Sequence, residues 1–360
     1  MDTIAYFISS HGFGHAARAC AVMEAIHQQK PDIHFYIFTK VPSWFFQNSL
    51  GNYYEYIDCL TDIGLIQHNP LHEDISSSIE ALNRFYPLNQ DLVTQLADQV
   101  KNYQCKLLIC DISPIGIDVA NQANIPSILI ENFTWDWIYE PYKRIDNRIN
   151  VYIDYLHDVF TQATYRIQTE PVCNPQSSEL TTPPVSRAIK KKSLQIRNEL
   201  HIHSSQQLIL ITMGGISSQN ILIDHLKQYP HVEFIVPGAS KQFKREENVI
   251  CLPNDSCFFH PDLVGACDAV IGKVGYSTLA EVYYAGIPFG YIARPIFRES
   301  KPLVQYIQTH MSGISIDEHL FYSHDWSTFL EPLIHLPKYQ HTHSNGSEYI
   351  AQWIMEEWLS

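Results

Sequence analysis

Short apolar runs alternate with amphipathic stretches along almost the whole chain. In the first half, β-branched and aromatic runs typical of strands occupy residues 3–9 (TIAYFIS), 33–39 (IHFYIFT), 54–58 (YEYID), 106–112 (KLLICDI) and 127–133 (SILIENF). Between the first two runs, Ala19, Val22 and Ile26 repeat at helical spacing. Apolar strands separated by helices predict a parallel sheet that is covered by helices on both faces.

The alternation of apolar runs and amphipathic stretches is interrupted once and then resumes. Residues 170–187 (EPVCNPQSSELTTPPVSR) contain four prolines among serines and threonines, which predicts an interdomain linker. Beyond it, strand-like runs return at 207–213 (QLILITM), 232–238 (VEFIVPG), 248–253 (NVICLP), 268–273 (DAVIGK) and 288–293 (PFGYIA). The pattern therefore predicts an α/β protein with two doubly wound, Rossmann-like domains facing a central cleft, at 1–169 and 188–345. An amphipathic helix at 346–360 is expected to pack back on the first domain.

Composition and charge limit the kinds of molecule that the protein is expected to bind. With 360 residues, 45% of them hydrophobic, the chain is long enough for two cores, and its net charge of −14 argues against nucleic-acid binding. No apolar run approaches the ~20 residues of a membrane span. Eight cysteines without a CxxC pair, several of them in apolar strands, indicate reduced thiols. We therefore expect a cytoplasmic protein that acts on small molecules, and the sequence leaves its oligomeric state open.

The first strand leads into a loop of two histidines and two glycines, SSHGFGHAAR. Ligands of open parallel sheets bind beyond the carboxyl ends of strands, where Gly12 and Gly14 would let a ligand approach the backbone. His15 stands at the start of the following helix, whose dipole favours the neutral imidazole that a general base needs. His11 is expected to line the loop. The alternative is a tight turn that carries surface histidines.

Two carboxylates end neighbouring strand-like runs. Asp111 closes KLLICD and Glu131 closes SILIE. A carboxylate beside a neutral imidazole orients it and stabilises the imidazolium formed after proton transfer. His15, Asp111 and Glu131 are therefore the candidate catalytic residues, although each carboxylate also suits a helix cap or a turn.

The second domain offers two candidate phosphate sites. Gly214, Gly215 and Ser217 follow a strand directly, where free backbone N–H groups suit phosphate or, alternatively, form a turn with a serine N-cap. A second strand runs into a glycine turn and a helix at 267–300, with a carboxylate one turn inside the helix for a ribose diol. The candidate donor-binding residues of this segment are Lys273, Gly275, Tyr276, Ser277, Glu281 and Glu299.

These motifs carry a family resemblance. Residues 267–300 resemble the donor site of GT-B glycosyltransferases, and of family 28 in particular, which includes the lipid I N-acetylglucosaminyltransferases. HGFGHAAR also resembles the amino-terminal region of plant arabinose kinases. By this resemblance His15 is the acceptor-side histidine, and Glu131 is the acidic residue that follows an "IP" strand. Glu281 is the ribose-binding glutamate.

The same resemblance places the donor diphosphate near the loop at 213–218 (MGGISS) and the helix after Gly275. Many family members bind the donor sugar through an Asp/Glu-Gln or Gln-Gln pair, whereas this chain has ESKP at 299–302. The sequence therefore leaves the sugar unidentified.

The resemblance implies a hexosyltransferase that moves a sugar from a nucleotide-sugar, most simply a UDP-sugar, to a hydroxyl acceptor. Inversion at the anomeric carbon is expected, with neither a metal ion nor a cofactor required. Two alternatives remain at this point: a sugar-nucleotide epimerase or hydrolase of the same fold, and a non-catalytic protein that binds nucleotide-sugars.

Overall fold

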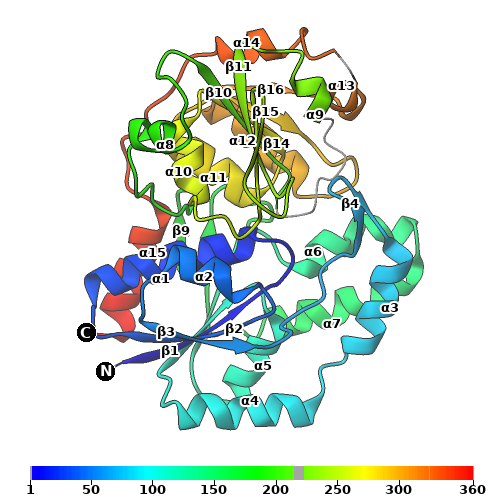
Figure 1. The fold of residues 1–360 in the computed structure, drawn as a ribbon. Coiled ribbons are helices and arrows are strands. Elements are labelled where there is room, and N and C mark those ends of the chain that lie inside the picture. The colour runs from blue at the N-terminus through cyan, green and yellow to red at the C-terminus, as the bar shows by residue number, and fades with distance from the viewer. Residues whose placement is uncertain (1, 215–222, 324, 360) are drawn as a thin grey trace.

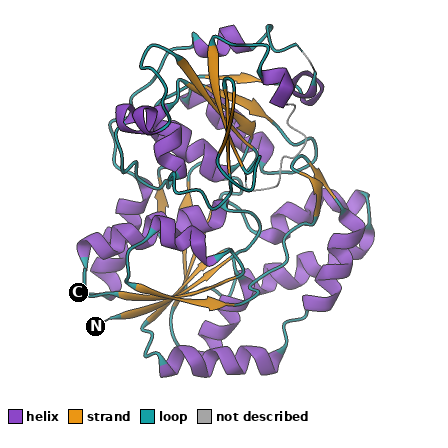
Figure 2. Ribbon diagram, viewed as in Figure 1, coloured by secondary structure: helices purple, strands orange, loops and turns teal. Residues whose placement is uncertain are grey.

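The computed structural model describes residues 2–214, 223–323 and 325–359, and the chain forms two seven-stranded sheets, one in each half (Figure 1). Helices lie on both faces of each sheet (Figure 2). The strands of the first sheet are all parallel. In the second sheet the edge strand β12 alone is antiparallel to its neighbour. The predicted α/β class with two doubly wound domains is confirmed.

The first sheet has the order β3-β2-β1-β6-β7-β8-β9. Its strands are β1 (Thr3–Ile8), β2 (His34–Thr39), β3 (Tyr54–Asp58), β6 (Leu107–Asp111), β7 (Ser127–Glu131), β8 (Tyr165–Thr169) and β9 (Leu180–Thr182). The helices of this half are α1 (Gly14–Gln29), α2 (Ser43–Ser49), α3 (Ile75–Phe85), α4 (Gln90–Asn102), α5 (Pro114–Ala123), α6 (Trp135–Tyr139) and α7 (Asn150–Phe160), with 3-10 turns η1 (Glu140–Arg144) and η2 (Asn147–Ile149).

The second sheet has the order β12-β13-β11-β10-β14-β15-β16. Its strands are β10 (Gln207–Thr212), β11 (Val232–Pro237), β12 (Lys244–Glu246), β13 (Val249–Leu252), β14 (Ala269–Lys273), β15 (Phe289–Ile292) and β16 (Gly313–Ser315). The helices that follow the first half are α8 (Ser193–Glu199), α9 (Ile223–Leu226), α10 (His260–Ala266), α11 (Tyr276–Ala285), α12 (Ser300–His310), α13 (Glu318–Tyr322), α14 (Leu330–Ile334) and α15 (Gly346–Trp358).

Each sheet has one point where the strand order reverses. In the first sheet it lies between β1 and β6, and in the second between β10 and β14. Ligands of doubly wound sheets bind at such points, because the crossover helices leave in opposite directions there and open a crevice. The segments after these four strands carry most of the candidate site residues.

The segment predicted as the linker is partly built into the first sheet. β9 lies inside it and pairs in parallel with β8, with Ile167 opposite Leu180. The free connection to the second domain is therefore shorter than residues 170–187. At the other end of the chain, α15 returns to the first domain and packs on α1 (Figure 1). Ile350, Ala351 and Ile354 of α15 are fully buried there.

A short hairpin of the first domain reaches into the second. It consists of β4 (Gln67–Asn69) and β5 (His72–Glu73) and rises at the right of Figure 1. Leu71 at its tip is fully buried in the hydrophobic cluster beside the second sheet, which includes Trp326. The imidazole of His72 lies 2.9 Å from a carboxylate oxygen of Glu318. The hairpin thus joins the domains at a second place.

Replacing Leu71 with alanine should lower the free energy of unfolding by about 2–3 kcal/mol, because a cavity forms at the domain junction while a short hairpin can shift to fill part of it. Denaturant unfolding followed by tryptophan fluorescence measures this, since Trp326 packs in the same cluster. Leu60→Ala is the control, because Leu60 is 37% exposed. Equal losses in the two variants would contradict burial of Leu71 between the domains.

Candidate active site in the interdomain cleft

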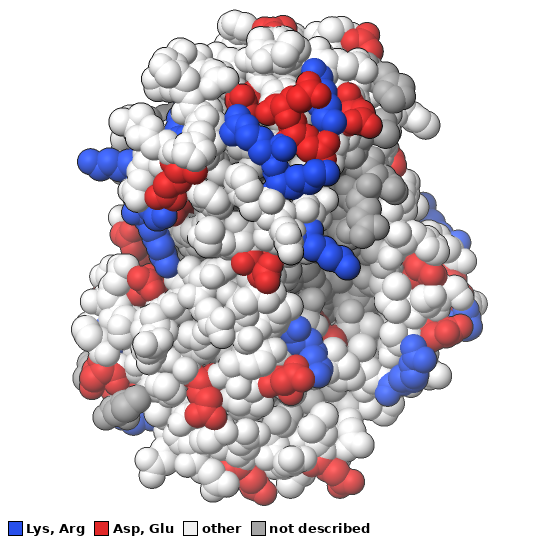
Figure 3. All heavy atoms as spheres, viewed as in Figure 1, with Lys and Arg blue, Asp and Glu red and all other residues white. Residues whose placement is uncertain are grey.

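Two adjoining cavities occupy the cleft between the domains, where Figure 3 shows the surface hollowed. The cavity lined by Glu281, here the Glu281 cavity, has about 800 Å³ of space, and the one lined by His15, the His15 cavity, has about 1140 Å³, part of each open to solvent. Four residues line both cavities: Phe13, Gly214, Ser277 and Thr278. A single extended ligand could therefore occupy the two cavities together.

Close approach of the two domains explains the glycines of the first loop. Gly12 has φ +73°, and a Cβ at this position would lie 3.7 Å from the Gly214 carbonyl oxygen. A Cβ at Gly14 would lie 3.5 Å from the Ser277 hydroxyl. The loop after β1 therefore faces the start of α11 across the cleft.

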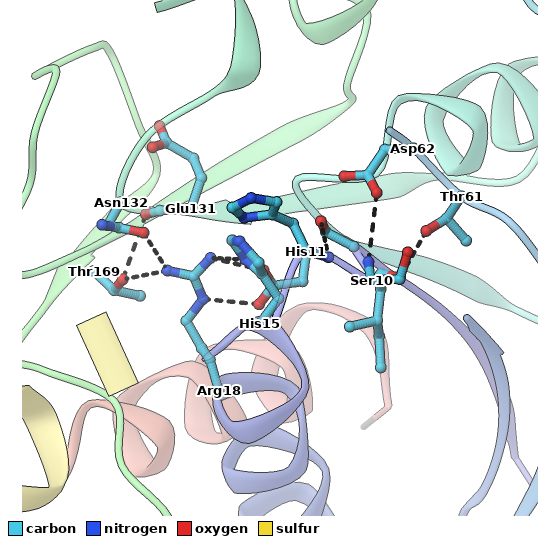
Figure 4. A network of polar contacts seen from close by, with 12 residues as sticks. Ser10, His11, His15, Arg18, Thr61, Asp62, Glu131, Asn132 and Thr169 are labelled. Carbon is cyan, nitrogen blue, oxygen red and sulfur yellow. Dashed lines mark hydrogen bonds and ion pairs between the residues drawn. The ribbon is translucent and has the colours of Figure 1, made fainter. Parts of the chain in front are cut away.

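Asp111 stands at the centre of the first domain's site. It ends β6, opposite Ile8 of β1, and is fully buried. His15, in the first turn of α1, places Nδ1 2.8 Å from Asp111 Oδ1. Arg18, one turn along α1, donates from Nε to Oδ2 and from Nη2 to Oδ1, both at 2.7 Å (Figure 4).

The negative charge of Asp111 is balanced by Arg18, and both side chains are buried. Burial alone would raise the pKa of Asp111, but Arg18 and His15 outweigh it and hold that pKa below its usual value. The carboxylate thus stays ionised in the core of the domain and fixes the imidazole of His15 by its Nδ1 edge.

The other imidazole nitrogen of His15 is left for chemistry. With the proton on Nδ1 and donated to Asp111, Nε2 carries a lone pair, and it has no hydrogen-bond partner among the residues that the structure describes. The ring lines the His15 cavity and is 8% exposed. Such an imidazole, oriented by a buried carboxylate, is built to accept a proton from a bound hydroxyl.

A chain of polar contacts crosses from this group to the second domain. Arg18 Nη1 donates to Asn132 Oδ1 at 2.7 Å, and Asn132 Nδ2 donates to Glu299 Oε1 at 3.0 Å. Sequence reasoning missed Arg18 and Asn132. Arg18 was recognisable as the basic residue three positions after His15 on one helix face, and Asn132 as the polar residue directly after a strand.

The expected partnership of Glu131 with His15 is wrong in this structure. Glu131 lines neither cavity, and its Oε1 accepts from Gln168 Nε2 at 2.8 Å. Successive side chains of a strand point to opposite sides, so Asn132 points toward Arg18 and Glu131 points away from it (Figure 4). Asn132 lines the His15 cavity. Burial raises the pKa of Glu131 to about 7, although Arg166 and Gln168 oppose this.

His11 lines the His15 cavity but has a structural contact of its own. Its Nε2 lies 3.0 Å from the Leu65 carbonyl oxygen, to which the neutral ring donates, and the ring meets Trp135 edge-on at 5.0 Å. Burial lowers its pKa well below the usual value. His11 thus shapes the loop as a neutral residue.

In the second domain, Glu281 lies deep in its cavity with two partners. Arg187 Nη2 lies 2.8 Å from Oε1 and His260 Nδ1 2.7 Å from Oε2. Burial alone would raise the pKa of Glu281, but Arg187 and His260 outweigh it and lower that pKa to about 2. Arg187 and His260 were not expected from the sequence. Aromatic side chains of Phe45, Phe258 and Phe259 complete the wall.

The other predicted donor residues differ in where the structure places them. Gly275 precedes α11, and, its chain neighbours apart, no atom of the described residues lies within 4 Å of a Cβ placed there, so the described residues leave the helix N-terminus open to the cleft. Ser277, Lys273 and Glu299 line the His15 cavity. Tyr276 lines it too, but its hydroxyl accepts from the Val185 N–H at 2.9 Å. The remaining two, Gly215 and Ser217, lie outside the described residues.

Comparison with known proteins identifies the family. The sequence profile described as glycosyl transferase family 1 matches residues 2–333. The chain belongs to this family. Its GT-B fold is shown by solved structures with which it shares little sequence. MurG of Acinetobacter baumannii has a TM-score of 0.55 at 13% identity, with 99% of this chain and 100% of that one covered. A UDP-glucosyltransferase of Polygonum tinctorium has a TM-score of 0.60 at 12% identity, covering 100% and 99%.

A third GT-B structure, Arabidopsis thaliana UGT89C1 complexed with UDP-L-rhamnose, has a TM-score of 0.59 at 9% identity and covers 99% of this family member and 94% of that chain. The predicted GT-B resemblance is confirmed. An L-arabinokinase of Arabidopsis thaliana is 25% identical over 359 residues, which are 98% of this chain and 34% of that protein. The chain thus spans about a third of the length of this relative, and the predicted likeness to plant arabinose kinases extends well beyond the first loop.

The described residues of this glycosyltransferase-family member contain no helix that is both long and apolar enough to cross a membrane. Nor do they hold a group of three or more His, Cys, Asp or Glu side chains arranged to bind a metal ion.

Proposed function

We propose that the protein is a cytoplasmic hexosyltransferase that moves a sugar from a UDP-sugar to a hydroxyl group of a small acceptor. One observation carries this: a histidine fixed by a buried carboxylate shares a cleft with an open helix N-terminus and a buried glutamate. The first group suits deprotonation of a hydroxyl, and the second suits a nucleoside diphosphate. The family match and the structural neighbours that carry UDP-sugars support the proposal.

The Glu281 cavity would take the nucleoside. Aromatic rings at its wall offer faces for the base, and the Glu281 carboxylate offers acceptors for the ribose diol. The diphosphate would lie where the cavities meet, against Gly214, Ser277 and the N-terminus of α11, whose N–H groups and dipole favour negative charge. The transferred sugar would then enter the His15 cavity.

In the reaction, His15 Nε2 takes the proton of the acceptor hydroxyl as its oxygen attacks the anomeric carbon. The bond from that carbon to the diphosphate oxygen breaks, and UDP leaves with the electron pair. The N–H groups near Gly214 and Gly275 stabilise its charge, so the step requires neither a metal ion nor a further cofactor. A single displacement of this kind inverts the anomeric configuration.

A ligand and product screen tests the proposal. Nucleotide-sugars and bare nucleotides should raise the melting temperature, since ligands that bind the native state stabilise it. Incubation with UDP-sugars should release UDP, slowly with water as the acceptor and faster with the true acceptor. An epimerised sugar, or binding without any turnover in the presence of a broad acceptor panel, would contradict glycosyl transfer.

Replacing Glu281 with alanine should weaken UDP binding by roughly 1.5–3 kcal/mol, because hydrogen bonds from the ribose diol to a charged group are lost. Calorimetric titration with UDP measures this. Glu331→Ala is the matched control, since the Glu331 side chain is 52% exposed in the same domain. Equal UDP affinity for Glu281→Ala and the parent protein would contradict the nucleotide site.

A further inference from the structure

Lys273 is a cation without a partner inside the cleft. It ends β14 and lines the His15 cavity. Among the residues that the structure describes, it makes no hydrogen bond and no ion pair. A Cβ placed on Gly214 would lie 3.4 Å from its Nζ, so the ammonium group sits beside the junction of the two cavities.

Arg294 lies on the same wall, and its Nε is a buried donor. It follows β15, the strand that pairs with β14, and is 5% exposed. Its guanidinium stacks on the Phe297 ring at 3.2 Å, and Nη1 lies 3.3 Å from Glu73 Oε1. Its Nε is buried and has no hydrogen-bond partner among the described residues. The guanidinium group thus lies at the wall of the His15 cavity, with Glu73 and Glu299 as its nearby carboxylates.

Two other cations of the cleft, unlike Lys273, are paired with carboxylates in the described residues. Arg18 is held by Asp111, and Arg187 by Glu281, each through two hydrogen bonds. A partly buried ammonium without such a partner is unfavourable, because it loses contacts with water that no protein group replaces. Burial, together with the charge of Arg294, lowers the pKa of Lys273 to about 7. An anion bound beside it would remove this cost.

The two cations lie outside the cavity proposed for the nucleoside. Lys273 and Arg294 line the His15 cavity and not the Glu281 cavity. The residues common to both cavities, such as Ser277 and Thr278, mark the junction between them. Arg294 thus lies on the side of the transferred sugar and the acceptor, and Lys273 lies between that side and the junction. Glu299, 3.8 Å from Arg294, offers a carboxylate for hydroxyl groups of the same ligand.

We propose that the His15 cavity takes a substrate with an anionic group, a carboxylate or a phosphate, bound by Lys273 Nζ and the guanidinium group of Arg294. The group belongs either to the transferred sugar, as in a hexuronic acid, or to the acceptor, as in a sugar phosphate. The inference rests on the proposed transfer from a UDP-sugar and names its substrate class. Lys273 supplies the charge, and Arg294 supplies a directed hydrogen bond.

Calorimetric titration with two arms tests the inference. The donor arm compares UDP-glucuronate with UDP-glucose, which differ at a single carboxylate. The acceptor arm compares glucose 6-phosphate with glucose on protein saturated with UDP. In one arm, the anionic ligand should bind roughly tenfold or more tightly than its neutral counterpart, the scale of a hydrogen bond to a charged group. The arm that responds identifies the source of the anion.

Two variants assign the preference to Lys273. Lys273→Met should abolish the preference and lower affinity for UDP itself far less than affinity for the anionic ligand, and Lys273→Arg should retain the preference. Because Lys273 has no partner in the described part of the chain, Lys273→Met leaves no group unpaired and should fold, which its UDP affinity verifies.

Several results would overturn the inference. If the parent protein binds UDP but shows no preference in either arm, the result contradicts the anionic substrate and leaves the proposed function uncontradicted. Loss of UDP affinity in Lys273→Met equal to its loss of the anionic ligand would assign Lys273 to the diphosphate instead. A parent protein that binds no UDP at all would contradict the proposed function, and the inference with it.

Discussion

Replacing His15 with alanine should reduce sugar transfer by about 10²–10⁴-fold, the usual effect of losing a general base. The reason is geometric: Asp111 holds the ring by Nδ1, and Nε2 has no partner among the described residues that could take its place. UDP affinity should change little, because the nucleotide site lies in the other domain. Initial rates with a UDP-sugar donor, measured by UDP release until the acceptor is known, provide the assay.

Two further histidines serve as controls for this variant. His11→Ala should cost much less in turnover, because His11 donates to the Leu65 carbonyl and shapes the loop. His231→Ala should leave turnover unchanged, since the His231 side chain is 56% exposed. Parental turnover in a folded His15→Ala protein would rule out His15 as the base and favour a glycine turn that happens to carry histidines.

Replacing Asp111 with asparagine should lower the free energy of unfolding by about 3–5 kcal/mol, because Arg18 then keeps a buried charge without its counter-ion. Denaturant unfolding measures this. Asp58→Asn is the matched control. Asp58 pairs with Lys40 at 2.8 Å, but their side chains are 62% and 47% exposed, and such surface pairs are worth about 0–1 kcal/mol. Similar losses in both variants would contradict a buried ion pair at Asp111.

The same variant should change the response to acid. The pKa of Asp111 is lower in the folded protein than in the unfolded chain, so the folded state gains stability from its ionised form. This stability is complete above the unfolded pKa of about 3.9 and is lost as the pH falls through the folded pKa. Asp111→Asn should therefore lose less stability than the parent protein when the pH is lowered from 5 toward 3.

Much of the fold could be predicted from the sequence because the signal is local. The run KLLICD became β6, and GKVGYST became the turn from β14 into α11, whose carboxyl end is Gly286 at φ +68°. Pro87 separates α3 from α4, since proline lacks the N–H that a helix interior needs. In each case the residues that specify the element lie within it.

The candidate site was predictable only in part. His15 stands at a helix start, Asp111 at a strand end, and Glu281 about one turn inside the helix after β14, near the edge where a parallel sheet directs ligand-binding groups. The choice between Glu131 and Asn132 depended on which of two adjacent side chains faces the cleft. Alternation along a strand predicts that the two side chains point to opposite sides, but only the packed sheet shows which of them faces the cleft. Arg187 and His260 are distant from Glu281 in sequence, so their pairing had no local signal.

The sequence by itself determined the two doubly wound sheets and the glycine loops after β1 and β14. It also singled out His15 as the histidine to test first. Periodicity and turn chemistry act over a few residues and survive without knowledge of the rest of the chain. Tertiary structure alone decided that Leu71 crosses into the second domain, that Arg18 and Asn132 connect Asp111 to Glu299, and that Lys273 lacks a partner in the described part of the cleft. These features depend on contacts between residues far apart in the sequence, and only packing of the two domains brings such residues together.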